Sequence, residues 1–181
     1  MRTSVSHPLR IATVVTGVSG HGRVGVTFCP GKYDPHGMSG AWNRDLALDL
    51  DTIRDWGATA VVTLLEPHEL TLLRVERLGE EVSRRNMQWF HLPIVDTNIP
   101  DKHFDRKWDV AGEELCSILR GGSDVVVHCR GGLGRAGTIS ARLLIELGIE
   151  PETAMARVRA VRPGAIENDL QEMYVLSLGK A

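Results

Sequence analysis

Few cysteines and no long apolar segment are present in this sequence. Its 181 residues include three cysteines, Cys29, Cys116 and Cys129, which lie far apart along the chain. So small and odd a number excludes a disulfide framework of the kind found in secreted proteins, and we expect a reducing, cytoplasmic environment. No apolar run approaches the roughly 18 residues that are needed to span a bilayer, so we expect no membrane insertion.

The sequence also has little net charge, no internal repeat and no segment with the composition of a linker. Charged residues make up 24% of the chain, yet the formal net charge is only -2. This balance argues against a general nucleic-acid or membrane-surface binder. The hydrophobic content of 43% is sufficient for a substantial core. We expect one domain over residues 1–181, with residues 1–8 loosely ordered, in a monomeric protein.

Segments with the patterns of strands and of helices alternate along the chain. This alternation predicts an α/β fold with a mostly parallel central sheet and helices on both faces. The predicted elements are two strands within 9–28, a helix at 41–56, a strand at 58–65, a helix ending near 86, a strand at 89–95, a helix at 101–119, a strand ending at 129, and helices starting at 135 and spanning 151–161 and 166–178.

The most informative stretch runs from residue 123 to residue 148. Three valines at 125–127 lead into His128 and Cys129, a glycine-rich loop follows, and an amphipathic helix begins at Arg135. In such a loop the backbone N–H groups point inward and the helix N-terminus adds partial positive charge, so the loop can bind an anion. The same field stabilises a thiolate on Cys129.

Phosphoryl transfer would use each part of this loop. Arg135 could hold two phosphoryl oxygens with its planar guanidinium, and Cys129 could attack in line to form a phosphocysteine. The alternative for Cys129 is a small apolar residue that ends a core strand. Backbone N–H groups would bind the phosphoryl group from residues Arg130, Gly131, Gly132, Leu133, Gly134 and Arg135.

His128 and an acidic residue would complete such a site. His128 either orients the loop and lowers the pKa of Cys129, or is a hydrogen-bonded core histidine. The leaving oxygen needs a proton from a carboxylic acid. Asp96 follows the predicted strand at 89–95, and the ends of parallel strands gather at one edge of a sheet. Asp101 is the rival acid, but it precedes a predicted helix and is better placed as its N-cap.

These residues resemble the cysteine-dependent dual-specificity protein phosphatases, and in particular the kinase-associated (cyclin-dependent kinase inhibitor 3-like) branch. The similarity extends beyond the loop to residues 27–32, 91–96 and 164–166. It implies a protein tyrosine phosphatase-like fold and a two-step hydrolysis that needs no metal and no cofactor. It also implies that Asp96 is the general acid and then the base. Gln171 resembles a position that helps to place the hydrolytic water; its alternative is a solvent-facing helical glutamine.

The sequence departs from that family directly after the loop arginine. The family usually has a serine or threonine there, whose hydroxyl assists breakdown of the phosphocysteine. This chain has Ala136, and the nearest hydroxyl belongs to Thr138. We therefore predict that the second step is slow.

The resemblance also defines the expected ligands. A chain of this length lacks the extra loops that build a deep phosphotyrosine pocket, so the expected substrates are proteins carrying phosphotyrosine, phosphoserine or phosphothreonine. Phosphate, vanadate and sulfate should bind the same loop. The alternatives are a phosphoinositide or small-molecule phosphatase, disfavoured by Leu133 where lipid phosphatases tend to have lysine, or a weakly catalytic phosphopeptide-binding module. A sulfur-transfer or arsenate-reducing enzyme ranks lower, because Cys129 has no close second cysteine in the sequence.

Overall fold

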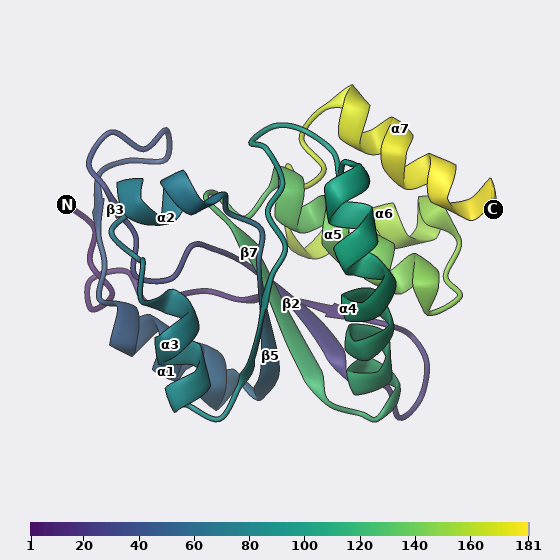
Figure 1. Cartoon of the computed structure of the whole chain (residues 1–181), viewed down its shortest axis with the longest axis horizontal. Helices are drawn as coiled ribbons and strands as arrows, with labels where there is room; N and C mark the ends of the chain where they lie inside the picture. The colour runs from purple at the N-terminus through teal and green to yellow at the C-terminus, as the bar shows by residue number, and fades with distance from the viewer. Residues whose placement is uncertain (181) are drawn as a thin grey trace.

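The structure is a computed structural model that describes residues 1–180, and its core is one five-stranded mixed sheet (Figure 1). β1 is antiparallel to β2, while β2, β7, β5 and β6 run parallel to one another. The prediction of an α/β fold with a mostly parallel central sheet is confirmed. In spatial order the strands are β1 (Ala12–Val15), β2 (Arg23–Phe28), β7 (Asp124–Cys129), β5 (Ala58–Thr63) and β6 (Gln88–His91).

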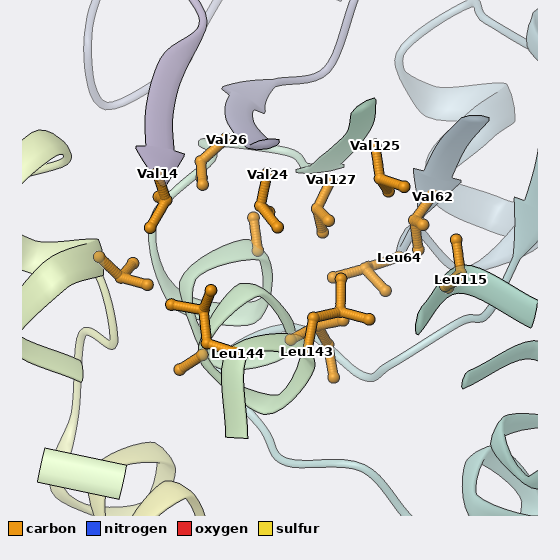
Figure 2. Close-up of a cluster of buried hydrophobic side chains, with 14 of the residues drawn as sticks. Val14, Val24, Val26, Val62, Leu64, Leu115, Val125, Val127, Leu143 and Leu144 are labelled. Carbon is orange, nitrogen blue, oxygen red and sulfur yellow. The ribbon is translucent and has the colours of Figure 1, made fainter. Parts of the chain in front are cut away.

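Helices cover both faces of this sheet, as Figure 1 shows, because its central strands are apolar on both sides. Val125 and Val127 of β7 face the core that contains α4 (Lys102–Arg120), α5 (Gly134–Glu146), α6 (Pro151–Val161) and α7 (Asp169–Ser177). Figure 2 shows this core, in which the strand valines meet Leu143 and Leu144 of α5. Val126 faces the opposite core, which contains α1 (Leu46–Trp56), α2 (Pro67–Leu72) and α3 (Leu78–Arg84).

Three predicted elements have different limits in the structure. The helix predicted at 41–56 begins only at Leu46, because the Asp45 side chain accepts a hydrogen bond from Leu48 N and caps it. Residues Trp42–Asn43 instead form β4, which pairs with β3 (Tyr33–Asp34). The helix predicted to end near 86 is divided into α2 and α3, and Arg74 between them has a φ of 58°. The strand predicted at 89–95 is the shorter β6.

The first eight residues are held against the rest of the chain, contrary to the expectation of loose order. Arg2 N donates to Ala41 O at 2.8 Å, and Arg2 O accepts from Asn43 N at 3.0 Å. Arg44 Nη1 reaches His7 O at 2.8 Å. These contacts tie the segment to residues 41–44, which include β4. Among the described helices, none combines the length and the apolar character required to span a membrane.

Candidate active site

Two glycines, Gly132 and Gly134, allow close approaches to the loop between β7 and α5. Gly132 has a φ of 68°, and a Cβ atom there would lie 2.4 Å from the backbone of Thr27. A Cβ atom on Gly134 would lie 2.1 Å from Glu167 Oε1 and 2.9 Å from Gln171 Nε2. The missing side chains therefore let the loop turn back against β2 and against the segment that precedes α7.

The carbonyl groups of this loop are bonded to groups around its outside. Arg162, which follows α6, donates from Nε to Gly132 O and from Nη2 to Gly131 O, both at 2.9 Å. Lys32 Nζ donates to Arg130 O at 3.2 Å. Within residues 1–180, the N–H groups of residues 131–135 donate to no protein acceptor. The loop thus presents free donors on one side while its acceptors are satisfied on the other, as an oxyanion site requires.

Arg135 is fixed beneath the loop by a buried ion pair that the sequence analysis missed. Its Nη1 and Nη2 atoms lie 2.7 and 2.9 Å from the two carboxylate oxygens of Glu69 on α2. Nη1 also donates to Ile94 O at 2.9 Å. Burial disfavours the charged guanidinium, but the hydrogen bonds that Arg135 donates to Glu69 and the charges of Cys129, Glu69 and Asp96 hold the pKa of Arg135 above its usual value. Arg135 is therefore a preorganised cation.

One edge of the Arg135 guanidinium remains for a ligand. Glu69 occupies the end formed by Nη1 and Nη2, whereas Nε is buried and has no partner within the described residues. Asp96 Oδ1 also lies 3.0 Å from Nη2. An arginine edge of two parallel N–H groups matches two oxygens of a phosphoryl group. A phosphoryl group would displace the Asp96 carboxylate from Nη2.

Cys129 is the cysteine of this site. It ends β7, is 4% exposed and lines the cavity described below. The other two thiols are kept protonated: burial raises the pKa of Cys29, and burial together with the charge of Glu146 raises the pKa of Cys116 to about 12. Both are therefore poor nucleophiles at neutral pH.

His128 is fully buried and neutral. Its Nδ1 atom lies 3.4 Å from Cys129 O, which can only accept, so we place the ring proton on Nδ1. Nε2 then accepts from the Thr63 hydroxyl at 2.7 Å, and Thr63 Oγ1 in turn accepts from Trp89 Nε1 at 2.8 Å. Burial lowers the pKa of His128 to about 4, so at neutral pH it supplies no positive charge to the thiol. The geometry fits a core histidine that orients the end of the strand.

The segment that carries Asp96 is held by the residues that cap α7. Asn168 Nδ2 donates to Thr97 O at 2.9 Å, and Gln171 Nε2 donates to Asn98 O at 3.3 Å. Asp96 itself is 54% exposed in its side chain. Asp101, the rival acid, accepts from Phe104 N at 2.8 Å and is the N-cap of α4. The segment 96–98, called the acid loop below, is thus anchored at its backbone, while the carboxyl group of Asp96 stays accessible.

Gln171 is buried, so its solvent-facing alternative is wrong. Its Oε1 atom accepts from Glu167 N at 3.0 Å, and its Nε2 atom bonds to Asn98 O. Both ends of the amide are therefore engaged in joining the start of α7 to the acid loop. Its contacts are those of a positioning residue.

A cavity of about 550 Å³ is lined by part of the predicted site. Phe28 and Lys32 belong to the same lining, and Lys32 Nζ lies 4.8 Å from the centre of the Phe28 ring. Arg130 forms a bidentate pair with Asp34, at 3.0 Å for each bond. Within residues 1–180, the His, Cys, Asp and Glu side chains form no group of three arranged to hold a metal ion. The lining residues at the phosphate loop and the segments next to it are Asp96, Thr97, Cys129, Arg130, Gly131, Leu133, Gly134, Arg162 and Glu167.

Comparison with known proteins shows the family to which the chain belongs. The sequence model of one family, PTP-SAK, described as "Swiss Army Knife protein, DSP-PTPase phosphatase domain", matches residues 35–175. The chain belongs to this family. The predicted resemblance to dual-specificity phosphatases, and to the kinase-associated branch in particular, is confirmed.

Individual relatives agree with the family. Over 135 residues the chain is 31% identical to cyclin-dependent kinase inhibitor 3 of Rattus norvegicus, covering 73% of this chain and 62% of that protein. It is 33% identical to protein tyrosine phosphatase type IVA 3 of Homo sapiens, covering 74% of this chain and 71% of that protein. The match thus spans about three-fifths of the cyclin-dependent kinase inhibitor 3 proteins.

Solved structures are similar over nearly the whole phosphatase domain. Kinase associated phosphatase with its catalytic site cysteine replaced by serine superposes with a TM-score of 0.79 at 25% identity, covering 93% of this chain and 92% of that chain. Tk-PTP in its active form gives a TM-score of 0.68 at 27% identity, covering 93% and 97%.

Three residues that contact or line the site were not predicted from the sequence: Glu69, Arg162 and Glu167. Glu69 is separated from Arg135 by 66 positions, and local spacing cannot pair residues at that separation. The available signal was the capping pattern of Glu66 and Glu69 around Pro67, which places Glu69 in the first turn of α2. Arg162 and Glu167 flank a Pro-Gly turn and carry no chemical pattern of their own.

Proposed function

We propose that this chain is a cysteine-dependent protein phosphatase that hydrolyses phosphotyrosine and/or phosphoserine and phosphothreonine through a phosphocysteine intermediate. The observation that carries the proposal is the ring of uncommitted N–H groups at residues 131–135 around Cys129, with a buried and partly uncommitted Arg135 beneath it. Donors fixed before the ligand arrives stabilise transition-state charge without reorganisation.

In the first step, the Cys129 thiolate attacks phosphorus while the loop amides and the Nε–Nη2 edge of Arg135 hold the non-bridging oxygens. The bond from phosphorus to the ester oxygen breaks, and Asp96 donates a proton to the leaving oxygen. Displacement of Asp96 from Arg135 by the phosphoryl group would free this carboxyl group for the leaving oxygen. In the second step, water attacks the phosphocysteine and releases inorganic phosphate.

The expected partners follow from this chemistry. A phosphorylated protein or peptide would be the substrate, and vanadate or sulfate would occupy the loop as phosphate analogues. The cavity has a volume of about 550 Å³, and Arg130, which lines it, is paired with Asp34. We infer that a cavity of this volume admits both aryl and alkyl phosphoesters. We propose that the protein acts as a monomer in the cytoplasm.

The test is hydrolysis of p-nitrophenyl phosphate by the native protein and by Cys129→Ser, with and without a metal chelator and vanadate. We expect activity that resists the chelator, is inhibited by vanadate and falls by about 10³-fold or more in the variant, because the nucleophile is lost. Unchanged activity in Cys129→Ser would contradict the proposal. Phosphopeptides and phosphoinositides tested side by side would separate the protein substrates from the lipid alternative.

The predicted slow second step has its own test. Ala136 is fully buried next to Arg135. Ala136→Ser should raise steady-state turnover by roughly threefold to tenfold if the added hydroxyl assists the departure of the thiolate, an effect within the usual range of one hydrogen bond. A native enzyme without a burst, together with an unchanged rate in the variant, would refute the prediction.

A further inference from the structure

A second carboxyl group, Glu167, lies at the phosphate loop, and the reaction described so far does not use it. Glu167 lines the same cavity as Cys129. Its Oε1 atom lies where it would meet a Cβ atom on Gly134 at 2.1 Å, so it is in contact with the last loop residue at the start of α5. The absence of a side chain on Gly134 thus leaves room for a carboxylate beside the expected phosphoryl group.

The backbone around Glu167 is fixed, whereas its carboxylate is uncommitted. Glu167 N donates to Gln171 Oε1 at 3.0 Å, and the preceding Ile166 N donates to Leu133 O at 3.3 Å. Within residues 1–180, no hydrogen bond and no ion pair reaches the Glu167 carboxylate. The other carboxylates of the site are paired: Glu69 and Asp96 with Arg135, and Asp34 with Arg130. Among these four carboxylates of the described site, Glu167 alone combines a fixed backbone with free carboxylate oxygens.

The surroundings of Glu167 favour a proton acceptor more effective than an ordinary surface carboxylate. Burial raises the pKa of Glu167, and the negative charge of Asp96 raises it further, against the opposing charge of Arg135. A base works best when its pKa approaches the operating pH. The charge of a phosphorylated Cys129 would act in the same direction as Asp96.

We propose, on the basis of the phosphatase function above, that Glu167 is the catalytic base of the second step. The Glu167 carboxylate takes a proton from a water molecule whose oxygen forms a bond to phosphorus. The bond between phosphorus and the Cys129 sulfur breaks, its electron pair stays on sulfur as a thiolate, and inorganic phosphate leaves. Asp96 then serves as the acid of the first step only. Gln171 holds Glu167 in place, because its side-chain oxygen accepts a hydrogen bond from the backbone N–H of Glu167.

This division of labour fits a chain with Ala136 after the loop arginine. No hydroxyl group stands there to assist the thiolate as it leaves. A more effective base for the attacking water would compensate for the missing assistance to the leaving thiolate, because the water attacks phosphorus opposite the sulfur.

The test is burst kinetics with p-nitrophenyl phosphate on the native protein and Glu167→Gln. The two steps separate because aryl alcohol is released in the first and phosphate in the second. We expect Glu167→Gln to leave the burst rate within about twofold of native and to slow the steady-state rate by roughly 10²-fold, the usual contribution of a general base. Phosphoenzyme should accumulate, and the rise of the second-step rate with pH should be lost.

Two further variants make the result decisive. Glu172→Gln makes the same change of charge on α7, at a residue that pairs with Arg159 outside the cavity, and should leave both steps unchanged. Glu167→Asp retains the acid and should keep the pH-dependent rise at a lower rate. Equal slowing of both steps in Glu167→Gln, or native behaviour of that variant, would overturn the inference alone. Unchanged hydrolysis of p-nitrophenyl phosphate by Cys129→Ser would overturn the proposed function and this inference with it.

Discussion

The floor of the site, which consists of Arg135 and Glu69, and the acid loop differ in how deeply their side chains are buried. On the floor, Arg135 is 1% exposed and Glu69 5% exposed in their side chains, and the pair is bonded at both carboxylate oxygens. In the acid loop, the Asp96 side chain is 54% exposed. The loop is held at its backbone carbonyls by the side chains of Asn168 and Gln171. Arg135, the proposed binding group, is therefore fixed within the core, whereas Asp96, the proposed proton donor, is exposed.

Loss of Glu69 tests the floor and should have the largest effect. Glu69→Ala would leave Arg135 as an uncompensated buried charge, which costs about 3–5 kcal/mol of unfolding free energy. Urea unfolding followed by tryptophan fluorescence measures this change, and activity should fall with it because the guanidinium is no longer oriented. Glu69→Gln, which keeps the shape and one acceptor, should lose less. Equal stability of native protein and Glu69→Ala would show that the pair is not structural.

Asp96→Asn tests the acid loop and should separate activity from stability. The first-step rate on a phosphopeptide should fall by about 10²–10⁴-fold, the range for removal of a general acid. The unfolding free energy should change by less than about 0.5 kcal/mol, because the side chain is exposed. The matched control is Asp101→Asn, since asparagine also caps helices well and should retain full activity. A larger loss in Asp101→Asn than in Asp96→Asn would reverse the assignment.

Acid should destabilise the protein through His128, which lies at the end of β7 next to Cys129. The pKa of buried His128 is lowered to about 4, against about 6.5 in the unfolded chain. Between these values the unfolded state binds more protons, so the stabilising contribution is full above pH 6.5 and declines as the pH falls toward 4. The loss approaches about 3 kcal/mol at the lower limit. Unfolding free energies measured from pH 7 to pH 4 should show this slope, and His128→Gln should remove it.

Asn168 allows the attachment of the acid loop to be weakened without loss of the helix cap. Asn168→Asp keeps the acceptor for Gln171 N but loses the donor to Thr97 O. We expect a threefold to tenfold fall in the first-step rate, equivalent to the loss of roughly one hydrogen bond, and little change in stability. Asn168→Ala removes both bonds and should also cost about 1 kcal/mol. An unchanged rate in Asn168→Asp would mean that Asp96 is positioned without α7.

Some properties of this protein were determined by sequence alone. The β-branched run at 125–127, the glycines after Cys129 and the apolar spacing after Arg135 specify strand, loop and helix through local propensity and periodicity. Asp101 as an N-cap follows from the same local rules and agrees with the structure. The alternation of elements was sufficient for the α/β class and the mostly parallel sheet.

The pairings across the site were decided only by tertiary structure. Glu69 meets Arg135 because β5 lies beside β7 in the sheet, which brings the α2 turn over the end of the loop strand. Glu167 reaches Gly134, and Gln171 is buried rather than exposed, because α7 docks against α5. Local propensity acts over a few residues, whereas these contacts join segments about 30 to 70 positions apart and depend on how the elements pack. The loop could therefore be predicted from the sequence, whereas its contacts with Glu69, Glu167 and Gln171 could not.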